Sequence, residues 1–104
     1  MAEIVWTDPA LDELEEIADY IALDNLPASK SLVQAVFDKV ARLENYPESG
    51  RFPSELKGLN YREVVVSPCR IFYRIEGEQV FILHVMRQEQ DLRKFLLANE
   101  RKTN

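Results

Sequence analysis

The chain has 104 residues, of which 46% are apolar and 30% are charged, and its formal net charge is -5. A chain of this length can bury roughly 65% of its unfolded surface, which suits one compact core and excludes two ordinary domains. The composition fits a soluble globular protein and argues against a fibrous repeat or wholesale disorder. We therefore expect a single domain that spans residues 1–104.

A few sequence features limit the cellular locations and the cofactors that are compatible with this chain. No apolar stretch approaches the ~18 residues of a membrane span, and the first residues have neither the basic nor the apolar region of a secretory signal. A single cysteine, Cys69, cannot form an internal disulfide, which fits a reducing compartment. Since His84 is the only histidine and no carboxylate cluster has ligand spacing, we expect no metal site and no cofactor. The sequence predicts a cytoplasmic protein that makes no contact with a membrane.

Charge is distributed unevenly along the chain. Residues 1–50 carry three basic and eleven acidic side chains, a net charge of -8, whereas residues 51–104 carry ten basic and seven acidic ones, a net charge of +3. The second half is the better face for an acidic partner, because opposite local potential speeds encounter. The acidic chain as a whole lacks a dense basic stripe, so we expect no general nucleic-acid binding and no direct sequence-specific DNA binding.

The first half of the chain predicts a short strand and two helices. Glu3–Trp6 is an apolar, β-prone run. Asp8 can accept hydrogen bonds from the amides of a first turn and Pro9 has no amide to lose, so a helix should begin here. Pro27 interrupts the periodicity, and a second helix then extends to about Tyr46. Two helices joined by so short a break are most simply an antiparallel hairpin.

Each predicted helix has one apolar face. The apolar positions recur at spacing three or four, namely Leu11, Leu14, Ile17, Ala18 and Ile21, then Leu32, Val33, Val36, Phe37, Val40 and Leu43. The opposite face of the first helix is acidic, with Asp12, Glu13, Glu15, Glu16 and Asp19. We interpret these acids as a solvated face rather than a binding site, since negative charge is favoured near a helix N-terminus.

The second half predicts a loop at residues 47–53 and three strands, Arg62–Val66, 69–75 and 80–86. Their short connections permit only antiparallel neighbours. Strict alternation in the last strand predicts Phe81, Leu83 and Val85 on one face and Val80, Ile82, His84 and Met86 on the other. Because two helices cover only one face of a sheet, we expect the other face to expose apolar surface, the usual mark of a partner site.

A strongly charged tail follows the last strand at residues 88–104. Leu92, Phe95 and Leu96 would line one side of a helix, which we expect to be frayed when free or to form on binding. The predicted order is thus an N-terminal strand, an antiparallel helical hairpin, a three-stranded antiparallel sheet and a C-terminal tail. This order defines an α+β fold.

Arginines are the side chains that best support a binding function. Four of them lie on or at the end of predicted strands, namely Arg62, Arg70, Arg74 and Arg87. The even spacing of Arg70 and Arg74 places both on one face of their strand. Each arginine either pairs with a carboxylate of its own chain or awaits one from a partner. A nucleophilic Cys69 with His84 as its base is the weaker alternative, because a lone cysteine among β-branched residues is usually a small buried hydrophobe.

Four segments, taken in order, resemble a known family. Residues 47–51 (PESGR) follow the two helices, and residues 61–66 (YREVVV), 69–75 (CRIFYRI) and 80–87 (VFILHVMR) come after them. This ordered set resembles the RelE/ParE superfamily of toxins from bacterial type II toxin-antitoxin modules, and the ParE branch most, over about residues 3–94. The resemblance implies a compact toxin in a hetero-oligomer with a cognate antitoxin, whose otherwise disordered segment folds onto the toxin and neutralises it.

The two branches of this superfamily imply different functions. ParE-like members act on DNA gyrase, whereas RelE-like members cut messenger RNA in the ribosome, which requires proton transfer and stabilisation of the phosphate's growing charge. Arg70 matches the strand arginine of RelE-like nucleases, and Lys57 and Arg62 could supplement it. No Tyr or His follows His84, and Phe95, near the position of the tail's acid-base residue, has no proton to give. We therefore expect inhibition of gyrase by binding, with no catalytic residue in the chain itself.

Three functional hypotheses follow. The leading one is the gyrase inhibitor, the second is a ribosome-dependent ribonuclease that uses Arg70 and His84, and the third is a module that has kept only antitoxin binding and co-repression. The residues expected to contact the target are Arg70, Arg87, Arg93, Lys94 and Phe95. The residues expected to contact the antitoxin are Arg62, Arg74, Ile82, His84 and Met86.

Overall fold

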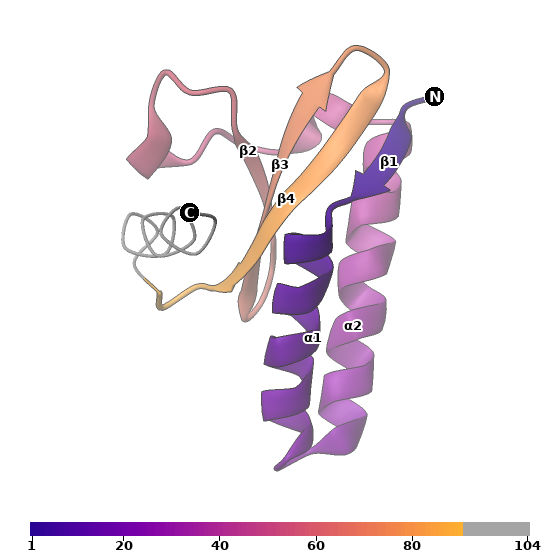
Figure 1. The fold of residues 1–104 in the computed structure, drawn as a ribbon, viewed down its shortest axis with the longest axis vertical. Coiled ribbons are helices and arrows are strands. Elements are labelled where there is room, and N and C mark those ends of the chain that lie inside the picture. Colours follow the sequence, from indigo (N-terminus) through magenta and orange to yellow (C-terminus); the bar gives the residue numbers. More distant parts are fainter. Residues whose placement is uncertain (91–104) are drawn as a thin grey trace.

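The computed structural model describes residues 1–90, which form the expected strand, helical hairpin and further strands. The first strand, β1 (Glu3–Trp6), leads into α1 (Asp8–Ala22), and α2 (Leu26–Ala41) follows after a tight turn. The two helices lie side by side along the length of the molecule (Figure 1), so the antiparallel hairpin is confirmed. Deep between them, the Ser29 hydroxyl donates to the Ala18 carbonyl at 2.6 Å.

Thr7 joins β1 to α1 and caps the helix. Its backbone is extended (φ -78°, ψ 155°), and its hydroxyl oxygen accepts a hydrogen bond from the Ala10 amide at 3.4 Å. The same hydroxyl donates to the Ile82 carbonyl at 2.7 Å, which ties the start of the helix to the sheet. The prediction that Asp8 caps this helix is wrong by one residue. Asp8 is instead the first helical residue, where its charge complements the helix dipole.

The second helix is shorter than its apolar pattern predicts. Asn25 caps its start by accepting a hydrogen bond from the Ala28 amide at 3.0 Å. The helix ends at Ala41, and the chain continues through a 3-10 turn at Arg42–Glu44 rather than as α-helix to Tyr46. A 3-10 turn keeps apolar side chains on nearly the same face as an α-helix does, so the sequence pattern does not distinguish the two.

Four strands form one mixed sheet in the order β1-β4-β3-β2. Strands β2 (Arg62–Val66), β3 (Cys69–Glu76) and β4 (Gln79–Arg87) are antiparallel neighbours, as predicted. Strand β1 runs parallel to β4 beside it (Figure 1), with Glu3 paired with Gln79 and Trp6 with Ile82. A parallel pair needs a long crossover, and here the hairpin and the other two strands supply it.

A bulge in β4 overturns the strict alternation predicted for that strand. Phe72 pairs with His84 and the next residue, Tyr73, pairs with Ile82, so Leu83 is an extra residue. An extra residue shifts every later side chain to the opposite face. Val85 therefore joins Val80 and Ile82 in the core, whereas Met86 packs with Phe72 on the other face. The predicted face made by Val80, Ile82, His84 and Met86 is wrong for this reason.

The main core lies between the helical hairpin and one face of the sheet. Its fully buried members come from both layers and include Ala10, Val36, Val40, Leu43, Ile71, Tyr73, Val80, Ile82 and Val85. The other sheet face exposes less apolar surface than predicted. Phe72 and Met86 on that face are buried, and Leu56 from the 3-10 turn Ser54–Leu56 packs against them, whereas Phe81, paired with Arg74 on the same face, is half-buried. The sheet face opposite the helices is thus partly covered by the chain's own loop.

Tyr73 fastens the loop after the helices to the sheet. Its hydroxyl donates to the Pro47 carbonyl at 2.7 Å and accepts from the Gly50 amide at 2.9 Å, and the side chain is fully buried. Burial raises the pKa of this hydroxyl. Gly50 is needed here because of close approach: a Cβ at this position would meet the Tyr73 ring and hydroxyl and lie 2.8 Å from the Glu63 carbonyl.

We predict that Tyr73→Phe lowers the free energy of unfolding by about 1–3 kcal/mol, because it leaves the Gly50 amide and the Pro47 carbonyl without this buried partner. Urea denaturation followed by circular dichroism measures the change. Tyr46→Phe is the matched control, since Tyr46 is 68% exposed and should change stability by less than about 0.5 kcal/mol. Equal effects of the two substitutions would contradict the role given to Tyr73.

Candidate functional site

A cluster of two arginines and two glutamates lies on the sheet face opposite the helices. Glu63 on β2 is its centre, with a side chain only 1% exposed. Its carboxylate accepts from Arg51 Nε at 2.7 Å and from Arg70 Nη2 at 2.6 Å. Arg70, on β3, also donates to both oxygens of Glu55, at 2.8 and 3.1 Å. All three nitrogens of the Arg70 guanidinium therefore donate to carboxylates of the same chain.

The pKa values of Glu55 and Arg70 favour the charged form of this pair. The hydrogen bonds from Arg70 lower the pKa of Glu55 to about 2. The same bonds, with those to Glu63, raise the pKa of Arg70. A carboxylate with so low a pKa is a poor general base at neutral pH. The cluster carries two positive and two negative charges, so it presents no net positive charge to a phosphate.

A shallow pocket of about 370 Å³ opens beside the cluster. Its lining residues come from the loop, strands β2 and β3 and the turn after β4, namely Arg51, Phe52, Ser54, Glu55, Glu63, Arg70 and Gln88. Arg70 has an 11% exposed side chain, and Glu55 lies across its guanidinium. An incoming anion would have to displace Glu55 before it could reach Arg70. The pocket can hold polar groups, but Glu55 covers the Arg70 guanidinium in it, and its other cation, Arg51, is paired with Glu63 through Nε.

The other predicted arginines are also paired within the chain. Arg62 donates to the Glu48 and Gly50 carbonyls at 3.1 and 3.0 Å, and its guanidinium lies 4.3 Å from the centre of the Phe52 ring. Arg74 shares the face of Arg70, as predicted, and forms an ion pair with Glu76 at 2.7 Å. Pairing with a carboxylate of the same chain therefore describes Arg74, whereas Arg62 bonds backbone carbonyls instead.

Arg87 ends β4 on the side of the sheet near α1. It pairs with Glu89 at 3.1 Å, and its guanidinium lies 5.3 Å from the centre of the Tyr20 ring. With a side chain 38% exposed, it remains accessible to a partner. The other expected target contacts, Arg93, Lys94 and Phe95, lie outside the described residues.

His84 and Cys69 do not form a nucleophile and base pair. Cys69 is fully buried, and burial raises the pKa of its thiol to about 11. His84 lies opposite Phe72 in the strand register, and its Nδ1 is 3.2 Å from Glu13 Oε1 on α1. A protonated, buried thiol is inert, so the structure removes the basis for this alternative.

Two of the expected antitoxin contacts are buried within the chain itself. Ile82 lies in the main core and Met86 beneath Leu56, and neither has exposed surface. Ile82 precedes the bulge and is buried because its face packs against the helices, whereas the bulge at Leu83 turns Met86 to the opposite face. Another expected antitoxin contact, His84, reaches the surface beside α1. Its side chain is 19% exposed.

The cluster includes residues that sequence reasoning did not single out. Glu55, Glu63 and Arg51 were not assigned roles, although Glu63 interrupts an apolar strand and a charge in such a place is rarely buried without a partner. That signal could have indicated an ion pair, but not its partners. Among residues 1–90 no group of histidine, cysteine and acidic side chains is arranged to bind a metal. No helix within that range is long and apolar enough to cross a membrane.

Comparison with known proteins gives concordant matches. Residues 4–92 match the family described as the ParE toxin of the type II toxin-antitoxin system parDE. A putative toxin of Sinorhizobium fredii, Y4kP, is 40% identical over 89 residues, which are 84% of this chain and 88% of that protein. Toxin RelE2 of Caulobacter vibrioides is 33% identical over 89 residues, covering 84% of this chain and 92% of that protein.

Solved structures agree on the fold. A chain of the chromosomal ParDE toxin-antitoxin system from P. aeruginosa matches with a TM-score of 0.73 and 25% identity, covering 86% of this chain and 98% of that one. A chain of the RelBE2 toxin-antitoxin complex from Mycobacterium tuberculosis matches with a TM-score of 0.56 and 19% identity, covering 84% and 98%. The second match supports the fold alone.

The pairing of Glu55 with Arg70 predicts a pH-dependent contribution to stability. A carboxyl whose pKa is lowered on folding stabilises the protein above its unfolded pKa of about 4.5 and loses this effect as the pH falls towards about 2. We expect Glu55→Gln to lower the free energy of unfolding by about 0.5–1 kcal/mol at pH 7, since the pair is partly exposed. The difference from the wild type should vanish between pH 4.5 and pH 2.

Urea denaturation at pH 7, 4 and 2.5 measures this dependence. Glu15→Gln, on the exposed side of α1, is the control and should show no such trend. A Glu55→Gln deficit that stays constant down to pH 2.5 would show that the ion pair is not its cause.

Proposed function

The chain belongs to the ParE toxin family of type II toxin-antitoxin systems, and from this premise we propose that it inhibits DNA gyrase by binding it in the cytoplasm. A cognate antitoxin neutralises it by covering part of its surface. In this proposal the chain carries out no chemistry of its own. Its activity comes from adhesion to gyrase while the DNA is cut, which disfavours religation.

The state of Arg70 is the observation that carries this proposal. RNA cleavage by a 2'-hydroxyl requires a cation for the phosphate and groups that transfer protons. Arg70 would be the cation of a RelE-like site, but Glu55 and Glu63 already occupy its donors. His84, the other residue of that hypothesis, is held by Glu13 near α1, whereas Arg70 contacts Glu55 and Glu63 beside the loop. The described residues thus favour binding over catalysis.

Arg87 is the proposed target contact that the described residues support best. It is partly exposed at the end of β4, and its guanidinium lies 5.3 Å from the centre of the Tyr20 ring, a side chain that is itself 65% exposed. Arginine and tyrosine are enriched among the residues that dominate binding energy at protein interfaces. We propose that Arg87 contacts gyrase together with Arg93, Lys94 and Phe95 of the tail. Arg70 contributes to the proposed target surface only indirectly, because it binds Glu55 and so holds the adjacent loop in place.

The antitoxin is the second proposed partner. The solved chain that is 25% identical to this one belongs to a toxin-antitoxin system, ParDE of P. aeruginosa, which supports an antitoxin as partner. An antitoxin segment that folds on binding must bury a large area to offset its ordering entropy. We propose that Arg62, Arg74 and His84 contribute to this area, with antitoxin carboxylates near the two arginines.

The proposal is tested by incubating purified chain with gyrase and plasmid DNA, and separately with programmed ribosomes. We expect lost supercoiling and trapped cleaved DNA in the first assay, because the chain holds gyrase while the DNA is cut. We expect an intact message in the second, because residues 1–90 place no proton-transfer pair beside Arg70. Arg87→Gln should raise the concentration needed for inhibition by about 10-fold, as expected for an interface anchor. Arg42→Gln, an exposed arginine after α2, is its matched control.

The outcomes separate the three hypotheses. Unchanged supercoiling at toxin excess would contradict gyrase inhibition. Cleavage of the message in the ribosomal A site, lost on Arg70→Ala, would favour the ribonuclease instead. Absence of growth arrest when the chain is expressed alone would favour the module that only binds its antitoxin.

A further inference from the structure

Within residues 1–90, half of β4 has no neighbouring strand on its outer side. β1 pairs with β4 only along residues 79–82, and it ends where Thr7 begins the turn into α1. β4 continues for five more residues to Arg87, paired with β3 on its inner side. Residues 83–87 therefore present an outer edge next to α1. This edge continues the one that β1 covers at residues 79–82.

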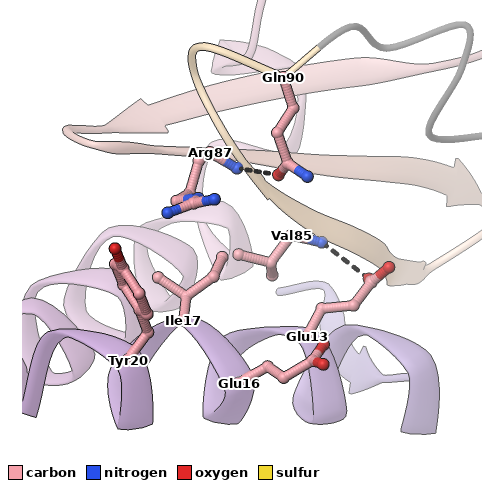
Figure 2. Close-up of a pocket in the computed structure, with 7 residues that line it drawn as sticks. All are labelled: Glu13, Glu16, Ile17, Tyr20, Val85, Arg87 and Gln90. Atoms are coloured by element: carbon pink, nitrogen blue, oxygen red, sulfur yellow. Dashed lines mark hydrogen bonds between the residues drawn. The ribbon is translucent and has the colours of Figure 1, made fainter. Parts of the chain in front are cut away.

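Side chains take the place of a strand along this edge. The Val85 amide donates to Glu13 Oε1 at 3.1 Å, and the Arg87 amide donates to Gln90 Oε1 at 2.9 Å (Figure 2). In an antiparallel pair, alternate residues direct their amides and carbonyls to the same side, so Val85 and Arg87 both turn these groups outward. The backbone carbonyls of an added strand could accept hydrogen bonds from outward amides at this spacing.

A groove of about 350 Å³ runs between this edge and α1. Figure 2 shows Ile17 and Val85 facing each other across it, with Tyr20 and Arg87 at one end and Glu13 and Glu16 at the other. The apolar side chains of Ile17 and Val85 thus line its middle, and Glu13 and Glu16 place carboxylates at one end. The outer face of α1 next to it adds Asp12, Glu15 and Asp19.

We propose that this groove takes an extended segment of the antitoxin, which adds as a strand beside residues 83–87 of β4. The segment carries an apolar side chain against Ile17 and Val85 and a lysine or arginine near Glu13 and Glu16. This inference rests on the proposed function, because it assigns a site to the antitoxin of that module.

The length of the free strand edge and the charge of the groove favour an extended, cationic segment. Five residues of strand edge span about 17 Å, which fits a short extended segment better than a helix, since only an extended backbone can pair with successive outward amides. Negative charge at the Glu13 end attracts a cationic side chain. A second copy of this chain would bring its own acidic α1 close to this one, and like charges at an interface are unfavourable.

Binding in this way exchanges one set of partners for another. Glu13 and Gln90 release the Val85 and Arg87 amides, and backbone carbonyls of the segment accept from them. Glu13 lies 3.2 Å from His84 Nδ1 and can keep that contact when it leaves Val85. The exchange leaves no amide of this edge without a partner, so its cost is small.

Amide hydrogen exchange measured by NMR tests the site. The probe is the full-length product of the reading frame adjacent to this gene, coexpressed and purified with the chain. We expect exchange of the Val85 and Arg87 amides to slow at least about 10-fold in the complex, because ladder hydrogen bonds within a sheet open less often than side-chain caps at an edge. Unchanged exchange of both amides in a formed complex would overturn the site while leaving the proposed function intact.

A pair of isosteric variants tests the charge argument. Glu16→Gln removes a charge from the groove, whereas Glu15→Gln removes the same charge from the neighbouring position outside its lining. We expect Glu16→Gln to weaken antitoxin binding about 2- to 5-fold at low salt, with the difference lost at high salt, and Glu15→Gln to weaken it less. Equal effects of both variants would contradict a cationic segment in the groove.

The remaining outcomes are also decisive. Protection of the two amides in the free chain that rises with its concentration would assign the groove to a second copy instead. Failure of the chain to bind the adjacent gene product at all would contradict the antitoxin part of the proposed function, and with it this site.

Discussion

The buried carboxylate of Glu63 is the constraint on which the candidate site depends. A carboxylate that is 1% exposed is costly unless cations pair with it, and Arg51 and Arg70 both do so. Arg70 then holds Glu55, and the turn that carries Glu55 also places Leu56 over Phe72 and Met86. One buried charge thereby fixes a strand arginine, a loop and the cover of one sheet face.

Arg70 has a structural role in this arrangement. The arginine that would stabilise a phosphate in a nuclease is here a structural cation, because two carboxylates neutralise it. A substitution of Arg70 would disturb the loop and the buried Glu63 as well as any binding surface. Loss of toxicity after such a substitution would therefore not identify a catalytic residue, whereas Arg87, at the partly exposed end of β4, can be changed with less effect on packing.

Local features of the fold were predictable from the sequence, and its non-local features were not. The strand Arg62–Val66 and the start of the second helix beside Pro27 follow from β-branched runs and from proline chemistry. The bulge at Leu83 was not predictable, because nothing in an apolar run marks the extra residue, and it reversed the faces of Val85 and Met86. The cluster around Glu63 was also missed, since its members lie up to 19 positions apart, from Arg51 to Arg70, and meet only through the loop.

The central claim, that Arg70 is occupied by carboxylates of its own chain, is tested most directly by NMR of its Nε–H group. A trinucleotide whose central 2'-hydroxyl is replaced by hydrogen, and which therefore cannot be cut, is titrated into the free chain. The account predicts that the Arg70 Nε–H resonance stays in place at millimolar trinucleotide, since Glu63 and Glu55 hold the guanidinium. A saturable shift of that resonance would contradict it.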